Sequence, residues 1–228
     1  MEERYRHELK FQISPADYFA IRQRIFPLMQ KDPHARSDGL YLIRSIYFDN
    51  FDDKALREKV NGVALREKFR IRYYNDDFSY ITLEKKIKHN NLCLKKDARI
   101  SIEEYTSILS GKADFLSEQS PALVKELFQK MQTEMLRPKV MVSYVREPFI
   151  YQAGNVRVTF DSCIRTSLFQ QDFLNSKIQD ISATECPQDI VLEVKYDAFL
   201  PEIIADLLQL QDIRQQAFSK YAACRKYG

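Results

Sequence analysis

One stretch of the sequence repeats long cations at every second position: Arg66, Lys68, Arg70 and Arg72. Mostly apolar residues fall between them. Side chains alternate across a β-strand, so this stretch predicts a strand with one apolar face and one column of cations. Same-face neighbours on a strand lie about 6.5–7 Å apart. Like charges so close repel unless something anionic lies along them, which is either water with salt or a polyanionic ligand.

Other strand-like stretches carry the same pattern, with long cations and a few carboxylates on one alternate face. They contribute Arg6, Glu8 and Lys10; Glu84 and Lys86; Arg146; Arg157 and Asp161; and Glu193 and Lys195. For any one strand, an ordinary sheet with one face in water explains the pattern. The set as a whole favours arginine, which recognises phosphate oxygens through several planar donors. If helices cover the apolar faces, the charged faces turn into a lumen that requires an anionic guest.

Glu193 is the most informative carboxylate, because its neighbours in Val191-Leu192-Glu193-Val194 predict burial. One interpretation is an ion pair with a facing arginine. The other is a ligand for a hard divalent cation beside phosphate oxygens, since Mg²⁺ and Mn²⁺ favour oxygen ligands and Mg²⁺ sites often combine one or two carboxylates with substrate phosphates.

The elements that must position these residues are seven or eight strands, joined mostly by short turns, and several helices. A Ser14-Pro15 cap opens a helix to about Gln30, and a capping box at Ser101–Glu104 opens one that stops at Gly111. Further helices are predicted over about 121–135, 201–210 and 212–226. This order favours an α+β fold with an antiparallel sheet over a doubly wound sheet, in one domain spanning residues 1–228.

Composition excludes several classes of protein. The net charge of +3 is too mild for binding duplex nucleic acid over the whole surface, so no nucleic acid partner is expected. Five glycines with no phosphate-loop spacing exclude a P-loop or dinucleotide fingerprint. Four scattered cysteines favour a reducing compartment. Neither a signal peptide nor a run of ~20 apolar residues is present, so we expect a cytoplasmic protein.

Eight short segments, in order, resemble those of the VTC (vacuolar transporter chaperone) domain, the polyphosphate polymerase branch of the triphosphate tunnel metalloenzymes, or CYTH-like superfamily. The segments are Glu8-Leu9-Lys10-Phe11, Ser45-Ile46-Tyr47-Phe48-Asp49-Asn50, Phe69-Arg70-Ile71-Arg72-Tyr73-Tyr74, Leu83-Glu84-Lys85-Lys86, Ser143-Tyr144-Val145-Arg146, Arg157-Val158-Thr159-Phe160-Asp161, Leu192-Glu193-Val194-Lys195 and Phe218-Ser219-Lys220-Tyr221. The resemblance covers nearly the whole chain.

The resemblance implies an antiparallel eight-stranded β-barrel tunnel with a charged lumen, wrapped by helices. The implied activity is transfer of the ATP γ-phosphate to a growing polyphosphate chain, with Mn²⁺ or Mg²⁺. Glu193 would be the metal ligand. The phosphate-binding cations would be Lys10, Arg70, Arg72, Lys86, Arg146, Arg157 and Lys220, with secondary contacts from Glu8, Lys95 or Lys96, Tyr144, Lys195 and Ser219. Arg66 and Lys68 would lie at the tunnel mouth or in solvent.

Two departures from the family pattern bear on activity. A second lysine that the final helix of the family can carry is replaced by Ala217, and the lysine after Lys86 maps onto either Lys95 or Lys96. The opening Arg6-x-Glu8-x-Lys10 replaces the Glu-x-Glu-x-Lys of hydrolytic relatives, which favours holding a polyanion. Hydrolysis of tripolyphosphate or a nucleoside triphosphate, and binding of polyphosphate without catalysis, stay open. Because these polymerases commonly work beside a membrane protein, any such partner would be a separate chain.

Overall fold

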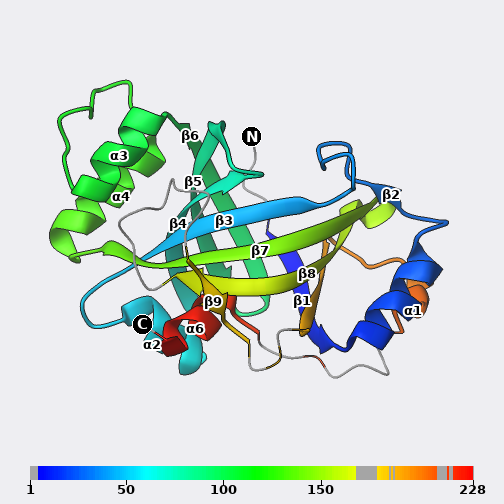
Figure 1. Ribbon diagram of the computed structural model, residues 1–228. Coiled ribbons are helices and arrows are strands. Elements are labelled where there is room, and N and C mark those ends of the chain that lie inside the picture. The colour runs from blue at the N-terminus through cyan, green and yellow to red at the C-terminus, as the bar shows by residue number, and fades with distance from the viewer. Residues whose placement is uncertain are drawn as a thin grey trace.

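The computed structural model describes residues 5–167, 179–184, 186, 188–209, 215 and 218–227. Eight antiparallel strands form a ring in the order β7-β3-β4-β5-β6-β1-β10-β8, and β8 pairs back with β7 (Figure 1). Two short strands, β2 (Gln30–Lys31) and β9 (Ile181–Ser182), extend β7 and β8. The ring strands are β1 (Arg6–Ile13), β3 (Tyr41–Asp49), β4 (Leu65–Tyr74), β5 (Asp77–His89), β6 (Leu92–Ile100), β7 (Arg137–Tyr151), β8 (Val156–Ser167) and β10 (Ile190–Tyr196).

The ring confirms the expected α+β tunnel, but it is not an even barrel. β1 pairs with β10 over seven residues and with β6 over only two, Arg6 with Cys93 and His7 with Leu92. These antiparallel strands meet only at their first residues and then diverge. The wall is therefore weakest between β1 and β6, and the interior opens there.

Helices cover the outside of the ring at two places (Figure 1). α3 (Ile102–Ser110) and α4 (Ala122–Thr133) pack against β3 to β6, where Phe69, Ile71 and Tyr73 of β4 are fully buried. α1 (Pro15–Ile25) and α5 (Glu202–Leu208) cover β1, β8 and β10. Because alternate strand residues point to opposite faces, this outer burial turns the cations of β4 inward.

The helix ends follow the expected capping chemistry. The Oγ of Ser14 accepts a hydrogen bond from the backbone of Asp17, and the Oγ of Ser101 does the same for Glu104. Gly111 ends α3 with a φ of 71°, which glycine adopts without strain. The first helix is shorter than predicted, because Gln30 leaves the helix and pairs with β7 as part of β2.

A short C-terminal helix, α6 (Lys220–Cys224), packs against β7 and α2. Tyr221 and Cys224 are buried among apolar side chains of β3 and β7, and the Tyr221 hydroxyl donates to Asp49 at 2.5 Å. Asp49 also accepts hydrogen bonds from the first turn of α2 (Lys54–Val60). Hydrogen bonds and packing therefore tie α6, and the residues just before it, to the ring.

Among the described residues, the prediction of a helix over 212–226 holds only from Lys220 onward. Gln215 forms an isolated β-bridge with Phe11, and Ser219 has the extended backbone of an N-cap. The Ser219 hydroxyl accepts from the backbone of Ala222, which starts the helix there. Ala217 lies outside the described residues. Within the part that is described, no helix is long and apolar enough to cross a membrane.

Candidate functional site

Three cavities with shared walls occupy the ring interior. One, which we call the α2 mouth, has a volume of about 400 Å³ and is lined by Lys59, Arg66 and Lys88 among others. A second, the β6 mouth, has about 430 Å³ and is lined by Cys93, Leu94 and Lys95 among others. A narrow centre of about 60 Å³ shares residues with both. Lys86 lines all three cavities, which together form a passage through the ring.

The centre gathers most of the residues that the sequence singles out. Among the described residues, eight Lys and Arg side chains line it, together with one carboxylate, two tyrosines and one serine. Of the predicted residues, the structure brings together Lys10, Arg70, Arg72, Lys86, Tyr144, Arg146, Glu193, Lys195, Ser219 and Lys220. They come from five strands and the start of α6. Such an excess of buried cations calls for an anionic guest.

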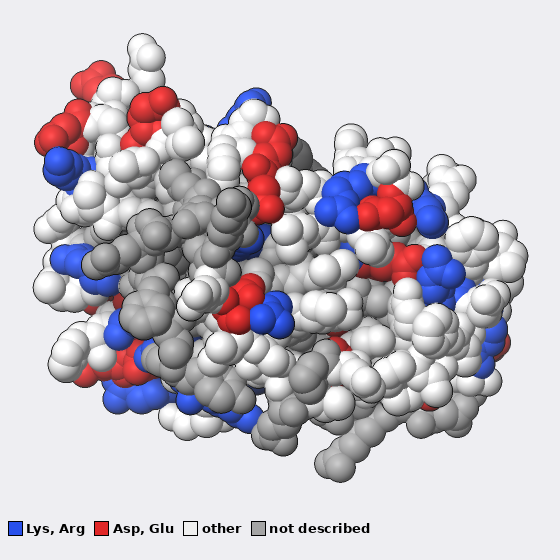
Figure 2. Space-filling model, viewed as in Figure 1, with Lys and Arg blue, Asp and Glu red and all other residues white. Residues whose placement is uncertain are grey.

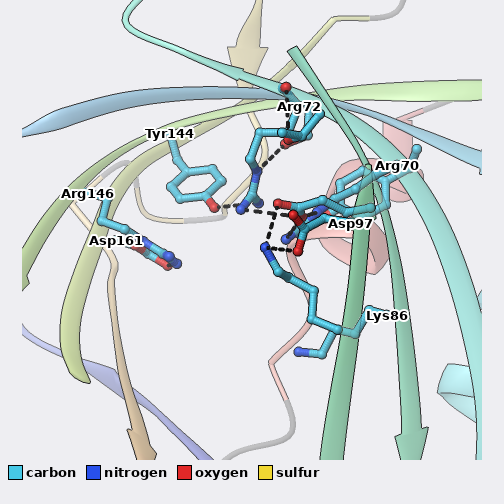
Figure 3. A network of polar contacts seen from close by, with 12 residues as sticks. Arg70, Arg72, Lys86, Asp97, Tyr144, Arg146 and Asp161 are labelled. Carbon is cyan, nitrogen blue, oxygen red and sulfur yellow. Dashed lines mark hydrogen bonds and ion pairs between the residues drawn. The ribbon is translucent and has the colours of Figure 1, made fainter. Parts of the chain in front are cut away.

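Two arginines of β4 are held in fixed orientations. Arg70 binds the buried carboxylate of Glu84 through Nε, at 2.6 Å, and donates to the Tyr47 hydroxyl at 2.8 Å. Arg72 donates to the Tyr144 hydroxyl at 3.0 Å (Figure 3). Planar guanidinium groups fixed in this way retain unused donors that can face a ligand.

Opposite them, Arg146 of β7 lies against the buried carboxylate of Asp161 on β8 (Figure 3). Two parallel hydrogen bonds of 2.6 and 2.7 Å join the groups, and Arg146 also donates to Glu193 at 3.0 Å. Lys220 of α6 binds the same Asp161 at 2.5 Å. Asp161 therefore holds two predicted phosphate-binding cations, Arg146 and Lys220, in position.

A third group joins β1, β5 and β10. Lys86 binds both oxygens of Glu8, at 2.6 and 2.7 Å. The Lys10 ammonium lies 3.2 Å from Glu8 and 3.5 Å from Glu193, and Lys195 lies 3.8 and 3.4 Å from the same two carboxylates. Glu8 and Glu193 therefore converge on shared cations.

The lumen carboxylates stay ionised although they are buried. Burial raises the pKa of Glu84, but Arg70 and Arg72 outweigh it and hold the pKa below its usual value. Burial likewise raises the pKa of Glu193, and Lys195, Lys10 and Arg146 together lower it well below normal. Four acidic residues, Glu8, Glu84, Asp161 and Glu193, thus compensate part of the positive charge, where the sequence alone drew attention to Glu193.

Four predicted residues do not line the centre: Arg157, Lys95, Lys96 and Glu8, the last of which lines both mouths. Arg157 lines the β6 mouth, where it binds Asp32 at 2.7 Å, because the start of β8 lies at the rim. Lys96 faces outward, since it is paired across the sheet with Lys85, whose ammonium binds Glu126 of α4. Lys95 is paired with Lys86 and lines the β6 mouth, so it is the member of the pair that faces the interior.

Lys68 and Tyr47 were not expected at the centre. The Lys68 ammonium lies 5.1 Å from the centre of the Tyr47 ring and 5.8 Å from that of Tyr221. Burial, opposed by Tyr47 and reinforced by Lys86, Lys10 and Arg70, lowers the pKa of Lys68 to about 7. For Tyr47, burial raises the pKa but the nearby cations lower it to about 7. The period-two pattern of β4 placed Lys68 on the inward face, but it did not indicate how far along the passage each inward residue lies.

Replacing Lys68 by methionine is expected to stabilise the protein without ligand and to weaken tripolyphosphate binding about tenfold or more, because one charged donor is lost. The folded-state pKa of Lys68 lies below its usual 10.5, so the unfolded chain binds more protons between about pH 7 and 10.5. The penalty on the wild type is complete below pH 7 and fades as pH rises. The thermal midpoint of K68M should therefore exceed that of the wild type at pH 6.5, and the gap should shrink at pH 9.5.

The exposed Lys112, replaced in the same way, is the control for K68M and should change neither quantity. Equal midpoints of K68M and wild type at pH 6.5, with unchanged tripolyphosphate affinity, would show that Lys68 is solvated.

The residues around Glu193 fit a hard divalent cation. Within the described residues no group of three or more His, Cys, Asp or Glu is placed to hold a metal. Glu8 and Glu193, however, already share the ammonium groups of Lys10 and Lys195. Two converging carboxylates suit Mg²⁺ or Mn²⁺ when substrate phosphates complete the coordination. The donor set is too small to hold such an ion tightly without a phosphate ligand.

A ring of strands around a cation-lined passage defines a tunnel-type α+β domain. A family model described as the VTC domain matches residues 5–227. The chain therefore belongs to the VTC domain family. No curated protein matches the chain.

Solved structures show the same fold at low sequence identity. A candidate adenylyl cyclase from Hippeastrum, described as having a dominant triphosphatase activity, is 14% identical, with a TM-score of 0.58 over 98% of this chain and 95% of its own. A candidate adenylate cyclase from Bacillus halodurans is 17% identical, with a TM-score of 0.54 over 95% of this chain and 94% of its own. At these identities the likeness shows the fold alone.

Proposed function

We propose that this domain synthesises polyphosphate, transferring the γ-phosphoryl group of ATP to the end of a chain held in the lumen. The observation that carries the proposal is the centre itself: among the described residues, eight Lys and Arg side chains line about 60 Å³, and the four carboxylates of Glu8, Glu84, Asp161 and Glu193 balance only part of their charge. A row of linked phosphates supplies the missing negative charge along the whole passage. Membership of the VTC domain family supports the same function. A cytoplasmic location, expected from the sequence, and a separate membrane-protein partner, expected from the family, belong to this proposal.

The arrangement suits phosphoryl transfer, which depends on positioning and on neutralising charge more than on covalent help from the protein. Arg70, Arg72 and Arg146 are oriented by Glu84, Tyr144 and Asp161 before any ligand enters. These donors therefore need little reorganisation when charge develops on the transferred phosphoryl group. Lys86 and Lys220, which are held by the different carboxylates Glu8 and Asp161, would bind further phosphates of the chain.

Mn²⁺ or Mg²⁺ would be held by Glu193, with Glu8 as the second carboxylate. When bound, the ion would neutralise phosphate oxygens of ATP and of the chain end. Lys10 and Lys195, which now bridge the two carboxylates, would turn their ammonium groups to phosphate oxygens. The two lysines therefore keep the carboxylates compensated in the absence of the ion.

Hydrolysis of tripolyphosphate or a nucleoside triphosphate is the second candidate. Two features favour it: the two converging carboxylates can hold a metal ion beside a phosphate, and a protein of the same fold from Hippeastrum is described as a triphosphatase. The acceptor, water or a polyphosphate end, distinguishes the two reactions.

The test uses the purified protein with ATP and Mn²⁺ or Mg²⁺, with products separated on a gel that resolves polyphosphate and with free phosphate measured in parallel. Polyphosphate synthesis predicts chains that lengthen with time together with equimolar ADP for each phosphate added. Phosphate release without chains would select the hydrolase. Metal-independent binding of polyphosphate without turnover would leave a binding module.

A further inference from the structure

The two mouths of the passage differ in how their cations are compensated. At the β6 mouth, Arg6 binds Asp197 at 2.9 Å and Arg157 binds Asp32 at 2.7 Å. Lys95, in the same mouth, has both Glu84 and Asp97 within 3.4 Å. Positive charge there is already balanced by the protein.

At the α2 mouth three of the cations have no such partners. Lys59, Arg66 and Lys88 line it, and within the part of the chain that the structure describes none of them forms an ion pair with a carboxylate. Arg66 instead donates to the backbone carbonyl of Val63. Two acids, Glu8 and Glu67, line this mouth as well, but both are already bound: Glu8 by Lys86 at 2.6 Å and by Lys10 at 3.2 Å, and Glu67 by Lys85 and Lys130 at 2.6 Å each.

The cations at the α2 mouth lie close enough together to lower one another's pKa. Burial lowers the pKa of Lys59, and Arg66, Lys88 and Lys10 lower it further. Burial also lowers the pKa of Lys88; Cys93 and Glu8 oppose this, while Arg66 and Lys86 add to it. These cations repel one another across a cavity of about 400 Å³.

One cation without a carboxylate partner continues this row into the centre. The α2 mouth shares Lys10, Lys68, Lys86 and Ser219 with the central cavity; Lys10 and Lys86 are bound to Glu8, whereas Lys68 contacts tyrosine rings in place of a carboxylate. On the face seen in Figure 2, Lys and Arg side chains also gather over α2, at the lower left. A cationic track therefore runs from the centre towards α2.

We propose that the α2 mouth binds the distal part of a chain of linked phosphates, so that the growing polyphosphate leaves the lumen past Lys68, Lys88, Arg66 and Lys59. An extended polyanion matches a row of cations that lack acidic partners, whereas a ligand of three phosphates needs only the centre. The inference rests on the proposed function, because it takes the reaction centre to be the central cavity.

The test compares two probes, tripolyphosphate and long-chain polyphosphate, and two triple variants. The mouth variant carries Lys59→Gln, Arg66→Gln and Lys88→Gln. The control variant removes the same charge from exposed positions around α3 and α4, with Arg99→Gln, Lys112→Gln and Lys125→Gln. We expect the mouth variant to bind tripolyphosphate within about twofold of the wild type and long-chain polyphosphate about tenfold or more weakly. The control variant should bind both as the wild type does.

Equal weakening towards both probes, or unchanged binding of the long chain, would overturn the proposal. A second measurement follows each protein's affinity as a function of polyphosphate chain length, so it does not require the variant to be as stable as the wild type. The affinity of the wild type should keep rising beyond three phosphates, whereas the affinity of the mouth variant should level off. Protein that shows this length dependence but makes no polyphosphate would refute the proposed function and leave the mouth site standing. Protein that binds neither probe would refute both.

Discussion

Exchange of Glu193 for glutamine is expected to lower the rate of metal-dependent phosphoryl transfer by about 10²–10³-fold, the usual cost of removing one group that stabilises charge in a transition state. Glu193 is the only carboxylate among the described residues that line the central cavity. Glutamine keeps the size of the side chain but cannot carry the negative charge that holds a divalent cation. Half-maximal activity should also require about 10–100-fold more Mn²⁺ or Mg²⁺.

Glu147 supplies a matched control for this experiment. It lies on β7, is as buried as Glu193, and binds Arg22 at 2.9 Å and the Tyr18 hydroxyl at 2.8 Å. Glu147→Gln therefore removes a buried, paired carboxylate outside the lumen. Its metal dependence should equal that of the wild type. A Glu193→Gln protein with wild-type turnover at low metal would exclude Glu193 as a metal ligand.

The period-two pattern predicted the lumen well because alternation is a property of every strand. Once Phe69, Ile71 and Tyr73 are buried under α3 and α4, Arg70 and Arg72 can only face inward. Resemblance to the family then assigned these positions to phosphate binding. Their placement in one cavity agrees with that hypothesis, and the binding role itself remains a prediction.

The sequence could not predict how far along the passage each inward side chain lies, or the register between neighbouring strands. Lys68 and Arg157 both point inward, yet Lys68 lines the centre and Arg157 lies at the rim, because Arg157 is only the second residue of β8. Lys95 and Lys96 could not be separated because a slip of one residue turns a strand over. The turn that pairs His89 with Leu92 fixes that register and places Lys95 opposite Lys86.

The compensating acids were also underestimated, and their energetic role is open to a direct test. Removal of Asp161, by Asp161→Ala, is expected to lower the free energy of unfolding by about 3–5 kcal/mol. Asp161 is fully buried and is the shared partner of Arg146 and Lys220, whose side chains are only 10% and 9% exposed. Without it, two buried guanidinium and ammonium charges lose their main counterion. Chemical denaturation in buffer free of phosphate measures the loss.

Tripolyphosphate should restore much of this lost stability, because the anion can take the place of the missing carboxylate. A ligand that binds only the folded protein adds about 2.7 kcal/mol when present at 100 times its dissociation constant. The increment should be larger for D161A than for the wild type, since Asp161 no longer competes for Arg146 and Lys220. Glu147→Ala leaves Arg22, which is more exposed and lies outside the lumen, without its carboxylate partner. Tripolyphosphate should therefore stabilise this variant no more than it stabilises the wild type. Equal increments in all three proteins would mean that anions in the lumen do not reach the cations that Asp161 holds.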